Sequence, residues 1–375
     1  MTNGEYCKKC VMKSSNPGIV IDKNGVCNIC NNTEYDSFYK NFKKSIKYYN
    51  KFKADMSSKD KSRKYDCIVM FSGGKDSINI LHKFAKEHNL RVLALTINLP
   101  FESETSKANI EKVVSELDVD HISLTPSTSG YIELMRSIFT QKQGDRILNV
   151  DGLTKYKHLS PCIACTSFIK IMSCFIAERF NIPYVLYCAD PGQMANLPIN
   201  IENTIEAMKS VFDVDFINYI FNDDIDKLDS KKNPNAPIVI YPYIAIPDYD
   251  PNKIISKLKA LGLYDSTPQE GHCILWSLLN YNAIKKYDSP FYILDYAHNI
   301  RNGKLDRDNT IQFLEAFKNM MFKVGEGKLT PKDDVHLRNI LDSVFTTKGE
   351  FEYTYSNIMK MSEIANKLDI SLSDI

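Results

Sequence analysis

The feature that most constrains this chain is a short apolar strand followed by two glycines and a helix. Cys67–Met70 has the length and apolar character of a buried parallel strand, and apolar residues recur at helical spacing over 78–85. The connecting loop reads Phe-Ser-Gly-Gly-Lys-Asp-Ser. Glycines let backbone N–H groups approach a ligand closely, and the first turn of a helix favours negative charge. The sequence therefore predicts an anion-binding loop over residues 71–77.

Polar side chains in this loop agree with that prediction. The hydroxyl groups of Ser72 and Ser77 can donate to phosphate oxygens, and Lys75 adds a positive charge. The pattern differs from the GxxxxGK(S/T) of P-loop nucleotide hydrolases. It resembles the PP-loop, S-G-G-x-D-S, of the N-type ATP pyrophosphatases, which split ATP between its α and β phosphates and adenylate a substrate. A plain turn without a ligand is the alternative.

Apolar runs and helical patterns alternate after the loop. Strands are expected over 91–97, 121–124, 184–188 and 238–241, and helices over 103–117, 131–141 and 160–180. Strands separated by helices predict a parallel, doubly wound α/β sheet, whose ligands bind at the carboxyl ends of the strands. The resemblance implies the same fold, of the adenine nucleotide alpha-hydrolase or HUP-like type, with ATP and Mg²⁺ as ligands.

The resemblance also implies roles for individual residues. The ATP-binding loop would comprise Ser72, Gly73, Gly74, Lys75, Asp76 and Ser77. Lys75 and Asp76 are expected to be catalytic. Thr96 and Asn98 end the next strand, where related enzymes hold the adenine and the ribose. Leu99-Pro100 stands near where many relatives carry an aspartate, so the contacts at this strand depart from the usual pattern.

Two CxxC pairs lie near the N-terminus. Cys7 and Cys10 form the first, and Cys27 and Cys30 form the second after 16 intervening residues. This spacing is typical of a four-thiolate zinc ribbon, and residues 17–25 read as a strand followed by an Asn-Gly hairpin turn. We predict a structural Zn²⁺ site. A redox-active dithiol pair is the alternative.

A later CxxC pair, Cys162 and Cys165, opens the helix expected over 160–180, and Cys273 follows far along the chain. This arrangement resembles that of sulfur-inserting tRNA thiolation enzymes, in which three cysteines hold a [4Fe-4S] cluster. The resemblance implies that these three cysteines are cluster ligands and that Lys170 and Asp190 are catalytic. A cysteine-persulfide route and plain core packing are the alternatives for the cysteines, and a loop cap is the alternative for Asp190.

The order of the motifs also resembles that of the N-acetyl sugar amidotransferases, including Cys10-Val11-Met12 and Asn24-Gly25-Val26-Cys27. Both families adenylate a carbonyl oxygen; one then introduces sulfur and the other nitrogen from a partner glutaminase. The later cysteines favour sulfur, which makes a sulfur donor a partner. We expect a small-molecule or carrier-bound amide as substrate ahead of a tRNA base. Amidotransfer and a non-enzymatic nucleotide-binding zinc-ribbon scaffold are the alternatives.

Composition limits the remaining options. The net charge of +1 excludes the overall basic field of a dedicated nucleic-acid binder, and no apolar run approaches the roughly 18 residues of a membrane span. Ten cysteines without a signal peptide indicate a cytoplasmic chain whose thiols serve metals or catalysis. The oligomeric state stays open, a homodimer being one option.

Four segments are expected in chain order. They are a zinc ribbon over 1–33, a basic helical linker over 34–64, the PP-loop domain over 65–250 and a mainly helical region over 251–375. Lysines and aromatic residues interleave in the second segment. It is either a solvated helix face followed by a charged linker, or a helix that docks on the nucleotide domain and contacts RNA phosphates. Further helices are expected over 201–212, 253–261, 273–287, 309–322, 331–344 and 355–368.

Overall fold

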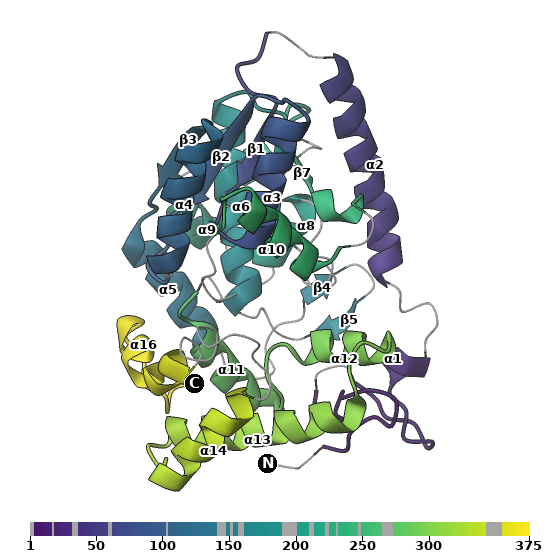
Figure 1. Cartoon of the computed structure of the whole chain (residues 1–375), viewed down its shortest axis with the longest axis vertical. Coiled ribbons are helices and arrows are strands. Elements are labelled where there is room, and N and C mark those ends of the chain that lie inside the picture. The colour runs from purple at the N-terminus through teal and green to yellow at the C-terminus, as the bar shows by residue number, and fades with distance from the viewer. Residues whose placement is uncertain are drawn as a thin grey trace. The chain divides into compact units, whose positions relative to one another are not determined.

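The computed structural model divides the chain into two compact units (Figure 1). The sheet unit comprises Ser37–Leu134 and Cys162–Ser266, and the helical unit comprises Met1–Asp36, Met135–Pro161 and Thr267–Ile375. The structure describes residues 4–16, 19–31, 37–58, 62–102, 104–140, 148–150, 153–156, 161–189, 201–209, 214–221, 225–229, 232–246, 249–264, 273–342 and 355–375.

A five-stranded parallel sheet forms the centre of the sheet unit. Its order is β3-β2-β1-β6-β7, with bounds Asp120–Leu124, Val92–Ile97, Cys67–Met70, Tyr184–Leu186 and Ile238–Ile240. Every residue of β1 and β2 is buried, as expected for strands covered on both faces. Successive strands run outward from β1 in opposite directions, which makes the carboxyl end of β1 the switch point where ligands of such sheets bind. The predicted doubly wound α/β sheet is confirmed.

Helices surround this sheet. They are α2 (Ser37–Ser58), α3 (Lys75–His82), α4 (Glu104–Leu117), α5 (Thr128–Phe139, which continues into the helical unit), α6 (Pro161–Arg179), α8 (Ile201–Lys209), α9 (Val214–Phe221) and α10 (Pro251–Ala260). The basic helix α2 packs beside β7 (Figure 1). Its Phe52 is buried, with ring centroids 5.1 Å from Tyr184 and 5.6 Å from Phe84. The predicted basic helix is therefore docked on the sheet unit through an aromatic contact.

Short connections complete the sheet unit. Helix α3 continues directly into a π-helical turn over Lys83–Glu87. Two 3₁₀ turns, Ile225–Leu228 and Pro242–Ile244, flank β7 in the chain. Asp250 caps α10 by accepting from the backbone N–H groups of its first turn, and Pro251 occupies its first position as predicted.

The helical unit joins the N-terminal cysteine pairs to the C-terminal helices. Its helices are α1 (Asn28–Asn31), α11 (Trp276–Tyr287), α12 (Ile293–Arg301), α13 (Arg307–Gly325), α14 (Pro331–Asp342) and α16 (Met361–Lys367). Val11, Met12 and Val26 share one buried apolar cluster with Ile293 and Leu314. The segment that carries the cysteine pairs therefore uses α12 and α13 as part of its core.

Three features of the fold depart from the expectations. Helices α9 and α12 were not predicted, and neither was the antiparallel hairpin of β4 (Leu148–Val150) and β5 (Leu153–Tyr156), although the intervening Asp-Gly is a known hairpin signal. A turn at Lys360 interrupts the single helix expected over 355–368. Within the described residues, no helix combines the length and apolar character needed to cross a membrane.

Candidate active site and metal centre

The loop after β1 has a conformation that only glycine tolerates at position 73. Gly73 has a φ of +73°, and a Cβ atom placed there would lie only 2.4 Å from the backbone oxygen of Ser106. Helix α4 causes this close approach, because the Ser106 hydroxyl donates to the Ser72 carbonyl and the Asn109 side chain donates to the Gly73 carbonyl at 3.1 Å. Both carbonyls are held from behind the loop, which fixes the loop's shape.

The two serines of the loop have different environments. Ser77 is buried; its hydroxyl donates to the Gly74 carbonyl at 3.0 Å and accepts from the Ser72 N–H at 3.3 Å. Ser72 is exposed. Helix α3 begins after Gly74 without a side-chain cap, so its first N–H groups remain available to an anion. We therefore assign Ser77 to the internal support of the loop and Ser72 to its ligand-facing side.

Two charged side chains follow the glycines. Lys75 Nζ lies 2.7 Å from Asp76 Oδ2, and the other carboxylate oxygen of Asp76 accepts from the Tyr249 hydroxyl at 3.0 Å. Tyr243 donates to the backbone oxygen of Asp76 at 3.1 Å and accepts from Asn79 at 3.0 Å. A lysine for phosphate oxygens and a carboxylate for Mg²⁺ fit the needs of bound ATP.

Sequence reasoning missed these two tyrosines. Tyr243 follows β7, and Tyr249 lies a few residues further on, just before α10. The available signal was positional, since residues after the carboxyl end of a parallel strand belong to the ligand-binding edge. Their assignment to Asp76 required the fold, because more than 160 residues separate the partners.

Thr96 and Asn98 lie at the end of β2, as predicted. The Thr96 hydroxyl is buried, donates to the Phe71 carbonyl at 2.7 Å and lies 2.9 Å from His121 Nε2. Asn98 is half-buried and donates to Ser123 at 2.6 Å. Thr96 thus supports, from the neighbouring strand, the start of the loop that follows β1. The contacts proposed for adenine and ribose at these two residues stay predictions.

The second predicted site opens at α6. The Tyr131 hydroxyl donates to Cys165 Sγ at 3.1 Å, and burial raises the pKa of this thiol to about 11. Lys170, further along the helix, is fully buried. Its Nζ lies 3.3 Å from the Tyr241 hydroxyl and 5.4 Å from the centre of the Tyr187 ring. Burial lowers the pKa of Lys170 to about 7, so this amine can hold or release a proton near neutral pH.

The predicted three-cysteine set involves both units. Cys162 and Cys165 belong to the sheet unit, and Cys273 belongs to the helical unit. The cluster-ligand role of the three cysteines stays a prediction. Asp190 lies outside the described residues, and its catalytic role also stays a prediction.

The N-terminal cysteines form a compact group. The Sγ atoms of Cys7, Cys10, Cys27 and Cys30 all lie within 4.8 Å of one another. Backbone N–H groups point at the sulfurs: that of Cys27 lies 3.2 Å from Cys7 Sγ, and that of Lys9 lies 3.3 Å from the same atom. Such donors stabilise thiolates, which are the forms that bind metals. The donor set and its geometry fit a four-coordinate metal ion.

Crowding of the four thiols has a visible electrostatic effect. A hydrogen bond from Cys10 lowers the pKa of Cys27, while the same pair interaction raises the pKa of Cys10. Several thiolates this close repel each other unless a cation compensates their charge. A bound divalent metal would supply that compensation, which is a second sign that the site fits one.

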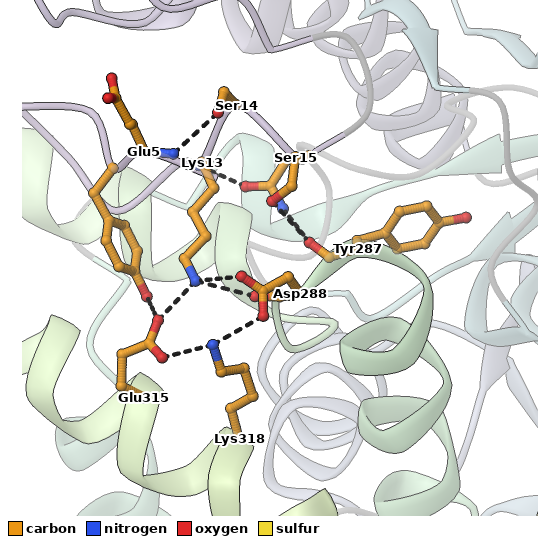
Figure 2. Close-up of polar contacts among 10 residues, drawn as sticks. Glu5, Lys13, Ser14, Ser15, Tyr287, Asp288, Glu315 and Lys318 are labelled. Atoms are coloured by element: carbon orange, nitrogen blue, oxygen red, sulfur yellow. Dashed lines mark hydrogen bonds and ion pairs between the residues drawn. The ribbon is translucent and has the colours of Figure 1, made fainter. Parts of the chain in front are cut away.

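A buried ion network attaches the first cysteine pair to the C-terminal helices (Figure 2). Lys13 Nζ lies 2.7 Å from a carboxylate oxygen of Asp288 and 2.7 Å from one of Glu315. Lys318 Nζ contacts the remaining oxygens of the same two residues at 2.8 and 2.6 Å. The Tyr6 hydroxyl also donates to Glu315 at 2.6 Å. The two lysines and the two carboxylates are thus paired with one another, and Lys13 is almost inaccessible to solvent.

The glycine-containing loop lies at the switch point of a parallel sheet, the place where α/β proteins of this architecture bind their ligands. The loop sequence and its strand-to-helix setting resemble those of the PP-loop ATP pyrophosphatases. No protein-family model matches the chain, and no curated protein matches it.

Two solved structures are similar to the chain. One is a U34-tRNA thiolase, NcsA, from Methanococcus maripaludis with its [4Fe-4S] cluster: identity is 16%, coverage is 82% of this chain and 88% of the thiolase, and the TM-score is 0.32. The other is an NMN synthetase from Francisella tularensis: identity is 12%, coverage is 70% and 95%, and the TM-score is 0.30.

Proposed function

We propose that the protein is an ATP-dependent adenylating enzyme that replaces a carbonyl oxygen by sulfur. The observation that carries this proposal is the phosphate loop, in which Gly73 is locked against α4 and the uncapped start of α3 lies beside Lys75 and Asp76. Such a cradle binds the phosphates of ATP without needing a side-chain contact at each oxygen. In this proposal the products are a thioamide or thiocarbonyl, AMP and pyrophosphate.

The two half-reactions make different demands on the chain. In the first, the carbonyl oxygen attacks the α-phosphorus and pyrophosphate leaves, its charge stabilised by Lys75 and the loop N–H groups. In the second, a sulfur nucleophile displaces AMP from the activated carbon. Asp76, held by Tyr249, would bind Mg²⁺ beside the phosphates. Lys170 would handle protons near the reacting carbon, since its amine is buried and titrates near neutrality.

Sulfur chemistry is supported by the later thiols. Cys165 lies at the start of α6, held by Tyr131, in the same unit as the phosphate loop. We propose that Cys162, Cys165 and Cys273 hold a [4Fe-4S] cluster, which when bound would present sulfide at an iron that lacks a protein ligand. Cys7, Cys10, Cys27 and Cys30 would hold a structural Zn²⁺.

The proposal extends to substrate and setting. We propose a small-molecule or carrier-bound amide as acceptor ahead of a tRNA base, a separate sulfur donor, and action in the cytoplasm, as a monomer or a homodimer. The net charge of +1 supports the small acceptor, because tRNA binding draws on a basic surface. Nitrogen transfer with a partner glutaminase is the alternative outcome of the experiment below.

Metal analysis on protein purified without oxygen tests the choice between sulfur and nitrogen. We expect about one zinc and about four irons per chain, with matching acid-labile sulfide, because one four-thiolate site and one three-cysteine cluster are proposed. Zinc alone, even after anaerobic reconstitution with iron and sulfide, would contradict sulfur insertion and favour amidotransfer.

Two single substitutions separate the metal sites. Cys273→Ser should lose the iron and keep the zinc, whereas Cys30→Ser should lose the zinc and keep the iron. Each variant is the control for the other, since both remove one half-buried thiol. A full iron content in Cys273→Ser would show that the proposed ligand set is wrong.

A further inference from the structure

Glu102 is a half-buried residue whose carboxyl group the mechanism above does not use. It lies between β2 and α4, at the carboxyl edge of the sheet where ligands bind. Its Oε2 atom is buried and has no hydrogen-bond partner among the described residues. Burial raises the pKa of the carboxyl to about 7. Nearly all buried polar atoms in proteins are hydrogen-bonded, so an exception at a ligand-binding edge points to a partner that the ligand supplies.

The chain around Glu102 is attached to both halves of the candidate site. A few residues after it, Ser106 and Asn109 of α4 hold the carbonyls of the phosphate loop. Directly before it, the ring of Phe101 lies 6.2 Å from that of Tyr131, which donates to Cys165.

Resting on the function proposed above, we propose that Glu102 binds the N–H group next to the substrate carbonyl and takes its proton during adenylation. An amide oxygen attacks poorly while its nitrogen keeps the proton, because the adduct would carry a positive charge. Here the oxygen forms a bond to the α-phosphorus, and the bond to pyrophosphate breaks with its electron pair. The electron pair of the N–H bond forms the C=N double bond of an adenylated imidate, and the proton moves to Oε2 of Glu102.

This role defines the class of substrate. The carbonyl carbon must bear an N–H group, as in a secondary amide such as an acetamido sugar or in the ring of a uracil base. Esters and fully substituted amides have no proton to give and would leave Oε2 of Glu102 without a partner. A site that pairs a buried polar group with its substrate rejects analogues that lack the pairing atom.

Glu102→Gln tests the proposal, with Glu116→Gln as control. Glu116 lies exposed on α4, so its substitution makes the same change in charge away from the site. The assay measures pyrophosphate release with ATP and either UDP-N-acetylglucosamine or an unmodified tRNA transcript as probe. We expect Glu102→Gln to lower kcat by about 100-fold or more, the usual effect of losing a general base, without changing ATP binding. Glu116→Gln should match the wild type.

A second readout does not depend on the probe. Because Oε2 has no partner within the described chain, Glu102→Gln should unfold at the same urea midpoint as the wild type at pH 8, or at a higher one. A clearly lower midpoint would overturn the proposal by showing that Oε2 itself has a structural partner. Unchanged kcat in Glu102→Gln, with an active wild type, would overturn this inference alone. An inactive wild type with both probes would overturn the proposed function, and this inference with it.

Discussion

At the scale of single residues, Gly73 is subject to two constraints. Its φ of +73° is costly for any residue with a Cβ, and a Cβ would also meet the Ser106 oxygen at 2.4 Å. Gly262, in the same unit, has a similar φ of +69° but nothing within 4 Å of its Cβ position. Alanine substitutions at Gly73 and Gly262 therefore separate the cost of the left-handed backbone from the cost of the close contact with Ser106.

We expect Gly262→Ala to lower the free energy of unfolding by about 1 kcal/mol, the cost of left-handed backbone. Gly73→Ala should lose about 1 to 3 kcal/mol more, because the added methyl group pushes α4 away from the loop, and it should weaken ATP binding as well. Urea unfolding and equilibrium dialysis with ATP measure the two effects. Equal losses in both variants would mean that the contact with Ser106 does not constrain the loop.

At the scale of elements, Lys13 joins the first cysteine pair to the end of α11 and to α13. Its side chain is 3% exposed, whereas Asp288 is 11% and Glu315 is 35% exposed, so the lysine is the most deeply buried member of the network. A lysine in a sequence is ordinarily expected at the surface. Its burial follows from partners that lie 275 and 302 residues further along the chain and could not be predicted locally.

Lys13→Met should lower the free energy of unfolding of the helical unit by about 3 kcal/mol, the lower end of the range for breaking a buried ion pair. The lower end applies because Lys318 still contacts both carboxylates. Lys23→Met, at an exposed position in the same segment, should change it by less than about 0.5 kcal/mol. Similar losses in both variants would show that the network adds little stability.

At the scale of the whole molecule, the sheet was largely predictable and the side-chain partners were not. Cys67–Met70 and Ile238–Ile240 are apolar runs whose strands pair as the alternating pattern requires. The partners of Asp76 were not predictable, because Tyr249 reaches it from beyond the last strand. Helix α12 was missed although Ile293, Ala297 and Ile300 recur at helical spacing on the face that packs on the cysteine-bearing segment.

This shared core predicts how metal loss acts on the molecule. Chelating the metal of the N-terminal cysteines should speed amide hydrogen exchange in α12 and α13, whose Ile293, Ala297 and Leu314 share the cluster. Strands β1 and β2 belong to the sheet unit and should keep their protection. Cys30→Ser should give the same pattern without a chelator. Exchange that rises equally in β1 would contradict this division.

The composition of the helical unit also has a consequence for synthesis on the ribosome. Cys30 is made early, whereas the apolar face of α12 that its segment packs against begins only at Ile293. At 5 to 20 residues per second, the two are separated by roughly 15 to 50 s. During that interval the nascent cysteine segment lacks the apolar surface that α12 and α13 provide. We expect early metal binding to hold the four neighbouring thiols together until the last helices emerge.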